Sequence, residues 1–122
     1  MNHLYIAACD ANGGIFHYTQ NDDGSLFQKE FYPMKEPMYL FIREGRLFVL
    51  LSAPFDKNED SGIFSYAINN DGSLTSPSGI ISTFGKVGCH LYVSDDMRDI
   101  YCANYVSGSV FKSPDALVTH KG

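Results

Sequence analysis

Short apolar runs, rich in aromatic and β-branched residues, recur along the chain and are separated by breaks of Gly, Asn, Asp and Pro. Such runs are typical of β-strands. No window keeps the 3.6-residue apolar period that would indicate a helix. The pattern therefore predicts an all-β protein, with strands over residues 4–9, 15–18, 26–31, 38–42, 47–51, 63–68, 80–84 and 100–104.

The chain also contains an internal repeat. Gly14–Tyr18 (GIFHY) recurs as Gly62–Tyr66 (GIFSY), and Asp23–Leu26 (DGSL) recurs as Asp71–Leu74, both at an offset of 48 positions. A weaker third copy starts at Gly108. In each full copy the Asp-Gly pair predicts a hairpin turn, because glycine accepts the positive φ that such a turn demands. A unit of roughly 50 residues is typical of a propeller blade, which is a four-stranded sheet.

Four strands per unit predict a partial β-propeller of roughly two and three-quarter four-stranded antiparallel blades. We expect one incomplete domain, with blades at about residues 1–34, 35–86 and 87–122. The first blade lacks an innermost strand, which the far C-terminus of a closed propeller often supplies. So few blades cannot close a ring. We therefore expect an N-terminal fragment of a longer propeller, or self-association through open blade edges.

Composition and charge narrow the classes of partner. Nine basic against fourteen acidic residues give a formal charge of -5, and no Lys/Arg cluster occurs, so nucleic acid is not expected. The chain has no signal segment and no apolar run of membrane-spanning length, so we expect a cytoplasmic protein that does not bind membranes. The cysteines Cys9, Cys89 and Cys102 lack CxxC spacing, which favours reduced thiols over a zinc site.

One stretch approximates a calcium loop. Thr19, Asn21, Asp23 and Gly24, followed by Glu30, have nearly the spacing of such a loop, but a threonine stands where the first aspartate ligand belongs. The repeat copy keeps the turn and loses two would-be ligands. A hairpin turn is the better interpretation, and we expect no metal and no cofactor.

The run from Gly88 to Val110, GCHLYVSDDMRDIYCANYVSGSV, resembles the signature of the seven-bladed propeller lactonases of the 6-phosphogluconolactonase type. The two earlier repeats resemble the first blades of that family. The resemblance implies a hydrolase of carbohydrate metabolism that converts 6-phosphogluconolactone to 6-phosphogluconate in the pentose phosphate pathway. Its partner would be a small sugar lactone, and no cofactor is implied.

The same resemblance implies a site at the mouth of the central channel, with His90 as the catalytic residue. Asn104, Tyr105 and Lys86 are the expected substrate contacts, the first two also as partners of His90. From the residues alone, a packed histidine is the commoner outcome, and a turn-capping asparagine or packing tyrosine is equally compatible. The arginine and carboxylate positions of the family have no counterpart up to Gly122, so we expect an incomplete active site.

Two other functions stay open. A related propeller isomerase acting on muconate-type lactones would use a similar channel mouth. A non-catalytic propeller remnant or interaction module would account for the missing blades. Whether the chain is an active enzyme by itself is left open by the sequence.

Overall fold

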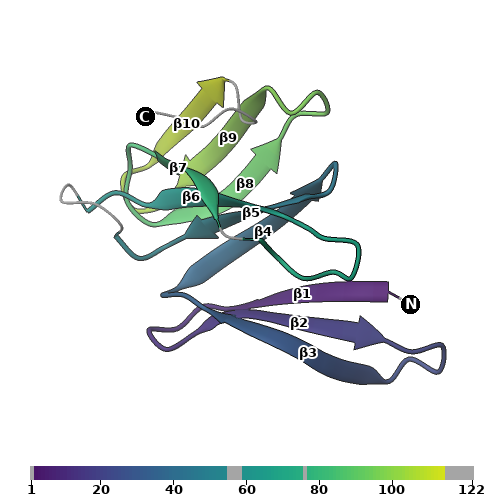
Figure 1. The fold of residues 1–122 in the computed structure, drawn as a ribbon. Coiled ribbons are helices and arrows are strands. Elements are labelled where there is room, and N and C mark those ends of the chain that lie inside the picture. The colour runs from purple at the N-terminus through teal and green to yellow at the C-terminus, as the bar shows by residue number, and fades with distance from the viewer. Residues whose placement is uncertain (1, 55–58, 76, 115–122) are drawn as a thin grey trace.

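The computed structural model describes residues 2–54, 59–75 and 77–114, and in them it forms ten strands in three antiparallel sheets (Figure 1). The first sheet has the order β1 (Asn2–Ala8), β2 (Gly14–Gln20), β3 (Leu26–Pro33). The second has the order β4 (Pro37–Arg43), β5 (Arg46–Leu51), β6 (Gly62–Ala67), β7 (Ser78–Ser82). The third has the order β8 (Gly88–Val93), β9 (Asp99–Asn104), β10 (Ser109–Pro114).

The expected all-β partial propeller is confirmed, since three small sheets are stacked face to face with the β4–β7 sheet in the middle (Figure 1). Both predicted hairpin turns form, with φ of 89° at Gly24 and 86° at Gly72. The strand predicted over 80–84 starts and ends two residues earlier, as β7. Residues 115–122 of the expected third blade lie outside the described part. In that part no helix is long and apolar enough to cross a membrane.

Strand β5 shows why the core divides into two layers. Its run RLFVLL is apolar on both sides because neighbouring sheets cover both faces of the second sheet. Leu47, Val49 and Leu51 pack toward the first sheet. Phe48 and Leu50 pack toward the third sheet. The alternation of strand side chains thus joins three sheets through one central strand.

Strands β4 and β8 are equivalent innermost strands of their sheets. Pro37 pairs with Leu51, and Gly88 pairs with Asn104, which is the corresponding position of the next sheet. An irregularity in the register follows each of these first residues. The first sheet differs: the repeat aligns β2 with β6, so β1 occupies the position of β5. In the described residues no strand pairs with the free edge of β1.

Candidate functional site

His90 lies on β8 and points away from the core. Leu91 and Val93 are fully buried against the second sheet, whereas His90 is exposed and Tyr92 is 43% exposed on the opposite side. Successive side chains of a strand point to opposite faces of the sheet, which accounts for this division. The edge strand β8 therefore presents an imidazole to solvent.

Tyr39 of the neighbouring sheet contacts His90. The two ring centroids lie 4.7 Å apart, with the planes tilted by 46°. Across the described residues, the His90 imidazole makes no hydrogen bond and no ion pair. An aromatic neighbour orients the ring while its nitrogens stay open to water or substrate. Sequence reasoning missed Tyr39, although its position in β4 is equivalent to that of His90 in β8.

Arg43, the last residue of β4, links this strand to the third sheet. Its Nε and Nη2 donate to the Val93 carbonyl at 3.3 and 3.0 Å, and its Nη1 lies 3.2 Å from Asp95 Oδ1. The guanidinium also lies over the rings of Phe41 and Tyr92, 5.2 and 5.7 Å from their centroids. Arg43 lies four positions along β4 from Tyr39, or about 13 Å. Arg43 therefore joins two sheets at a distance from His90.

Asn104, predicted as a substrate contact, is 2% exposed. Its Nδ2 donates to the Thr83 carbonyl at 3.1 Å and to Ser109 Oγ at 3.2 Å. Alternation along β9 places its side chain on the buried side, opposite to that of His90. These bonds give Asn104 a structural role at the junction of the second and third sheets, and its contact with substrate stays a prediction.

Tyr105 and Lys86 lie together at the end of the third sheet where β8 begins. The Tyr105 amide donates to the Val87 carbonyl at 2.8 Å, and the Val106 amide donates to the Lys86 carbonyl at 3.2 Å. Tyr105 is 75% exposed, and Lys86 is exposed as well. The structure thus brings both predicted contacts to the end of the sheet that carries His90. Their roles toward substrate stay predictions.

A second group of polar residues lies between the first and second sheets. His3 Nδ1 and His17 Nε2 are 2.9 Å apart, and the Tyr5 ring stacks on His17 with centroids 4.9 Å apart. His17 is 1% exposed and its Nδ1 lacks a hydrogen-bond partner in the described structure. Burial is the largest cause that lowers the pKa of His17, and the neighbouring His3 lowers this pKa further. The buried imidazole is therefore neutral near neutral pH.

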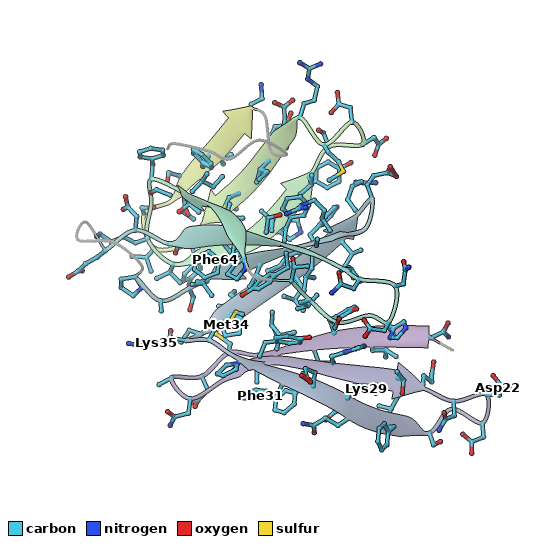
Figure 2. The ribbon with its side chains drawn as sticks, viewed as in Figure 1. Asp22, Lys29, Phe31, Met34, Lys35 and Phe64 are labelled. Atoms are coloured by element: carbon cyan, nitrogen blue, oxygen red, sulfur yellow. The ribbon has the colours of Figure 1, made fainter. Side chains whose placement is uncertain are left out.

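A polar cavity of about 190 Å³ adjoins this histidine pair. It is lined by His17, Lys29, Glu30, Asp71 and Ser73, so β2 and β3 meet the β6–β7 turn there. Figure 2 labels Lys29 on β3, beside this junction. The charges of Lys29, Glu30 and Asp71 act on the pKa of His17 in opposing directions.

The pattern that approximates a calcium loop is a hairpin turn in the structure. Asp23 Oδ1 accepts hydrogen bonds from the Ser25 amide at 2.9 Å and from Ser25 Oγ at 2.6 Å, which lower the pKa of Asp23. Thr19 is buried within β2. Over residues 2–54, 59–75 and 77–114, no three His, Cys, Asp or Glu side chains are grouped to hold a metal.

The three cysteines are free. Burial raises the pKa of the Cys102 thiol to about 12, so this sulfur is not a thiolate near neutral pH. Among the predicted site residues His90, Asn104, Tyr105 and Lys86, His90 is the side chain suited to accept a proton from water.

Residues 3–115 match the family model described as lactonase, 7-bladed beta-propeller. No curated protein and no solved structure matches the chain. The matched segment includes β8 and β9, and with them His90.

Proposed function

The chain belongs to the lactonase family of seven-bladed β-propellers, and from this membership we propose that it contributes His90 as the general base of lactone hydrolysis. The observation that carries the proposal is the exposed imidazole on β8, held by the Tyr39 ring 4.7 Å away. A base for this reaction must reach a water molecule, and an exposed, unpaired imidazole meets that condition.

The reaction needs two proton transfers at His90. The imidazole accepts a proton from water as the water oxygen attacks the lactone carbonyl carbon, and the tetrahedral oxyanion forms. The bond from that carbon to the ring oxygen then breaks, and the imidazolium returns the proton to the leaving oxygen. The product is an open-chain hydroxy acid. A donor for the oxyanion is also required, and Tyr39 carries a phenol on the ring that contacts His90.

The proposed substrate is 6-phosphogluconolactone, which places the reaction in the pentose phosphate pathway. The support for this choice is the Gly88–Val110 run together with the exposed Lys86 in the loop before β8. An ammonium group there would favour a dianionic phosphate. Comparing the phosphorylated and unphosphorylated lactones, with muconolactone as a third substrate, separates the proposed reaction from that of a muconate-type isomerase.

The test is hydrolysis of 6-phosphogluconolactone by the purified chain, measured above the spontaneous rate. The family's arginine and carboxylate positions have no counterpart up to Gly122. The acceleration that we expect is therefore that of general-base catalysis by His90 alone, which is typically about 10²-fold. His90→Gln removes the base while retaining a polar side chain, and should return the rate to background. Lys112→Gln, at an exposed position of β10, is the matched control and should keep the wild-type rate. A folded chain without acceleration, or a fully active His90→Gln variant, contradicts the proposal.

A further inference from the structure

The loops that lead into β4 and β8 end in the same backbone conformation. Glu36 precedes β4 and Val87 precedes β8, and their φ angles are 54° and 56°, which is uncommon for residues other than glycine. The Glu36 carbonyl accepts a hydrogen bond from the Ser52 amide at 2.9 Å, and the Val87 carbonyl accepts one from the Tyr105 amide at 2.8 Å. Ser52 directly follows β5, as Tyr105 directly follows β9. The two loop ends are therefore equivalent places in neighbouring sheets.

Each of these loop ends carries an exposed lysine. Lys35 lies four positions before Tyr39, and Lys86 lies four positions before His90. Tyr39 and His90 are the residues whose rings contact each other across the two innermost strands. Figure 2 labels Lys35 between β3 and β4. Each loop connects two of the described sheets, so both lysines lie at the ends of sheets and at the end where the strand of His90 begins.

Hydrogen bonds hold the backbone at both lysines. On either side of Lys35, the backbone amides donate to carbonyls of the β1–β2 turn at 3.1 and 3.0 Å. The Lys86 amide donates to Ser107 Oγ at 3.2 Å, and its carbonyl accepts a bond from the Val106 amide at 3.2 Å. A ligand that binds both ammonium groups therefore has only the side chains to order, which lowers the entropy cost of binding.

The two side chains can reach one group between the sheets. Packed sheets lie about 10 Å apart, and each lysine places its ammonium on a flexible four-carbon stem. The four positions from Lys86 to His90 span at most about 13 Å along the strand. In 6-phosphogluconolactone the carbonyl and the phosphate stand at opposite ends of the molecule. A phosphate between the lysines therefore leaves the lactone carbonyl on the side of His90.

We propose that Lys35 joins Lys86 in a phosphate subsite, so that the pair selects lactones that carry a phosphate monoester. Near neutral pH this group has about two negative charges, and two ammonium groups match them. A carboxylate has one charge and needs one such partner. The proposal rests on the proposed function, to which it adds Lys35 as a residue that determines specificity.

Glu36 is an acidic neighbour of this subsite. Its Oε1 accepts a hydrogen bond from Ser52 Oγ at 3.1 Å, which holds the carboxylate toward the end of β5. Its negative charge still opposes a nearby anion. Glu36→Gln should therefore strengthen the binding of a phosphorylated ligand, whereas loss of either lysine should weaken it.

The test is calorimetric binding of 6-phosphogluconate to the purified chain, with gluconate as the ligand that lacks the phosphate. The wild-type chain should prefer 6-phosphogluconate. Lys35→Gln should lower the ratio of the two affinities by about 5-fold, since an exposed ion pair contributes up to about that factor. Lys86→Gln should have a similar effect, and the double variant should bind both ligands about equally. Lys35→Arg keeps the charge and should keep the preference.

Lys29→Gln is the matched control. It removes the same charge from an exposed position in the middle of β3, away from the loop ends, and should bind both ligands as the wild type does. Circular dichroism of each variant shows that it is folded. A loss of preference in Lys29→Gln equal to that in Lys35→Gln would assign the effect to net charge and overturn the proposal.

Binding of these ligands does not require His90, so the phosphate subsite and the proposed hydrolysis can fail separately. A chain that prefers 6-phosphogluconate through Lys35 but does not accelerate hydrolysis would support the subsite and contradict the role of His90. A wild-type chain that binds neither ligand or both equally would overturn the subsite, even if it hydrolyses the lactone. So would a Lys35→Gln variant that keeps the full preference.

Discussion

Tyr39 and His90 occupy equivalent positions on the innermost strands of neighbouring sheets, and their rings touch with centroids 4.7 Å apart. Phe41 and Tyr92, two residues further along the same strands, repeat the contact at 5.3 Å. The spacing of two follows from strand geometry, since alternate side chains share a face. His90 is thus held in a short ladder of rings between two sheets.

Replacement of Tyr39 should therefore lower activity through the orientation of His90. An aromatic contact is worth about 0.5–1.5 kcal/mol, so we expect Tyr39→Ala to lower kcat by about 2- to 10-fold. Tyr39→Phe keeps the ring and should retain the rate if orientation is the whole effect; a loss in this variant would assign the phenol to the oxyanion. Steady-state kinetics on matched, folded samples checks the prediction. An unchanged kcat in Tyr39→Ala would show that the ring contact does not matter.

The sequence was sufficient for the features that depend on local periodicity. The repeat of Gly-Ile-Phe and Asp-Gly predicted sheets and turns. Alternation separates His90 from Leu91 and Val93, but which side of β8 is exposed depends on how the third sheet packs on the second. Arg43 could not be predicted in this way, because its partner is a carbonyl 50 positions away on another sheet. His17 is a similar case: its repeat equivalent is Ser65, so the pair with His3 is specific to the first sheet and depends on packing between strands.

Replacing Asn104 tests whether this residue has a structural role or contacts the substrate. Removing its amide leaves the buried Thr83 carbonyl without this donor, which typically costs about 1–3 kcal/mol. Asn104→Ala should therefore lower the free energy of unfolding by that amount and leave KM unchanged in the folded fraction. Urea denaturation and steady-state kinetics on one sample give both values. A raised KM with unchanged stability would instead support the substrate contact that the sequence predicts.

His17 predicts how stability depends on pH. Burial lowers its pKa from the ordinary value of 6.5. Below pH 6.5, His17 therefore binds a proton in the unfolded chain more readily than in the folded chain. The contribution of His17 to stability should be constant above this pH and fall as the pH decreases below it. The carboxyl groups with lowered pKa, Asp23, Asp71 and Asp96, start from 3.8 and lose their contributions only at more acidic pH.

The measurement is the thermal midpoint between about pH 4.5 and 6.5, where His17 dominates. His17→Ser introduces the residue found at the equivalent position of the second repeat, Ser65. Whatever its effect on absolute stability, this variant should flatten the pH dependence in that window. His3, Lys29, Glu30 and Asp71 also face His17 and are kept in the variant. An undiminished slope would assign the acid sensitivity to one of these groups.

Gly72 and Gly24 offer a test of the contact between the first two sheets. Both lie in Asp-Gly turns of the same repeat, with φ of 86° and 89°. Alanine at either position must adopt the left-handed region, at a cost of about 1–2 kcal/mol. A side chain on Gly24 meets no atom within 4 Å, whereas a Cβ on Gly72 would approach the His3 ring and lie 2.8 Å from His17 Nε2.

Gly24→Ala therefore measures the backbone cost alone, and Gly72→Ala measures the same cost plus displacement of the histidine pair. We expect the second variant to be less stable than the first by about 1–3 kcal/mol, because overpacking a closed contact has a cost of that order. It should also perturb the Tyr5 hydroxyl, which donates to the Gly72 carbonyl at 2.5 Å. Urea denaturation of the two variants gives the difference directly. Equal stabilities would mean that the β6–β7 turn moves away from β1 at no cost, and that the histidine pair does not fix how the first sheet packs on the second.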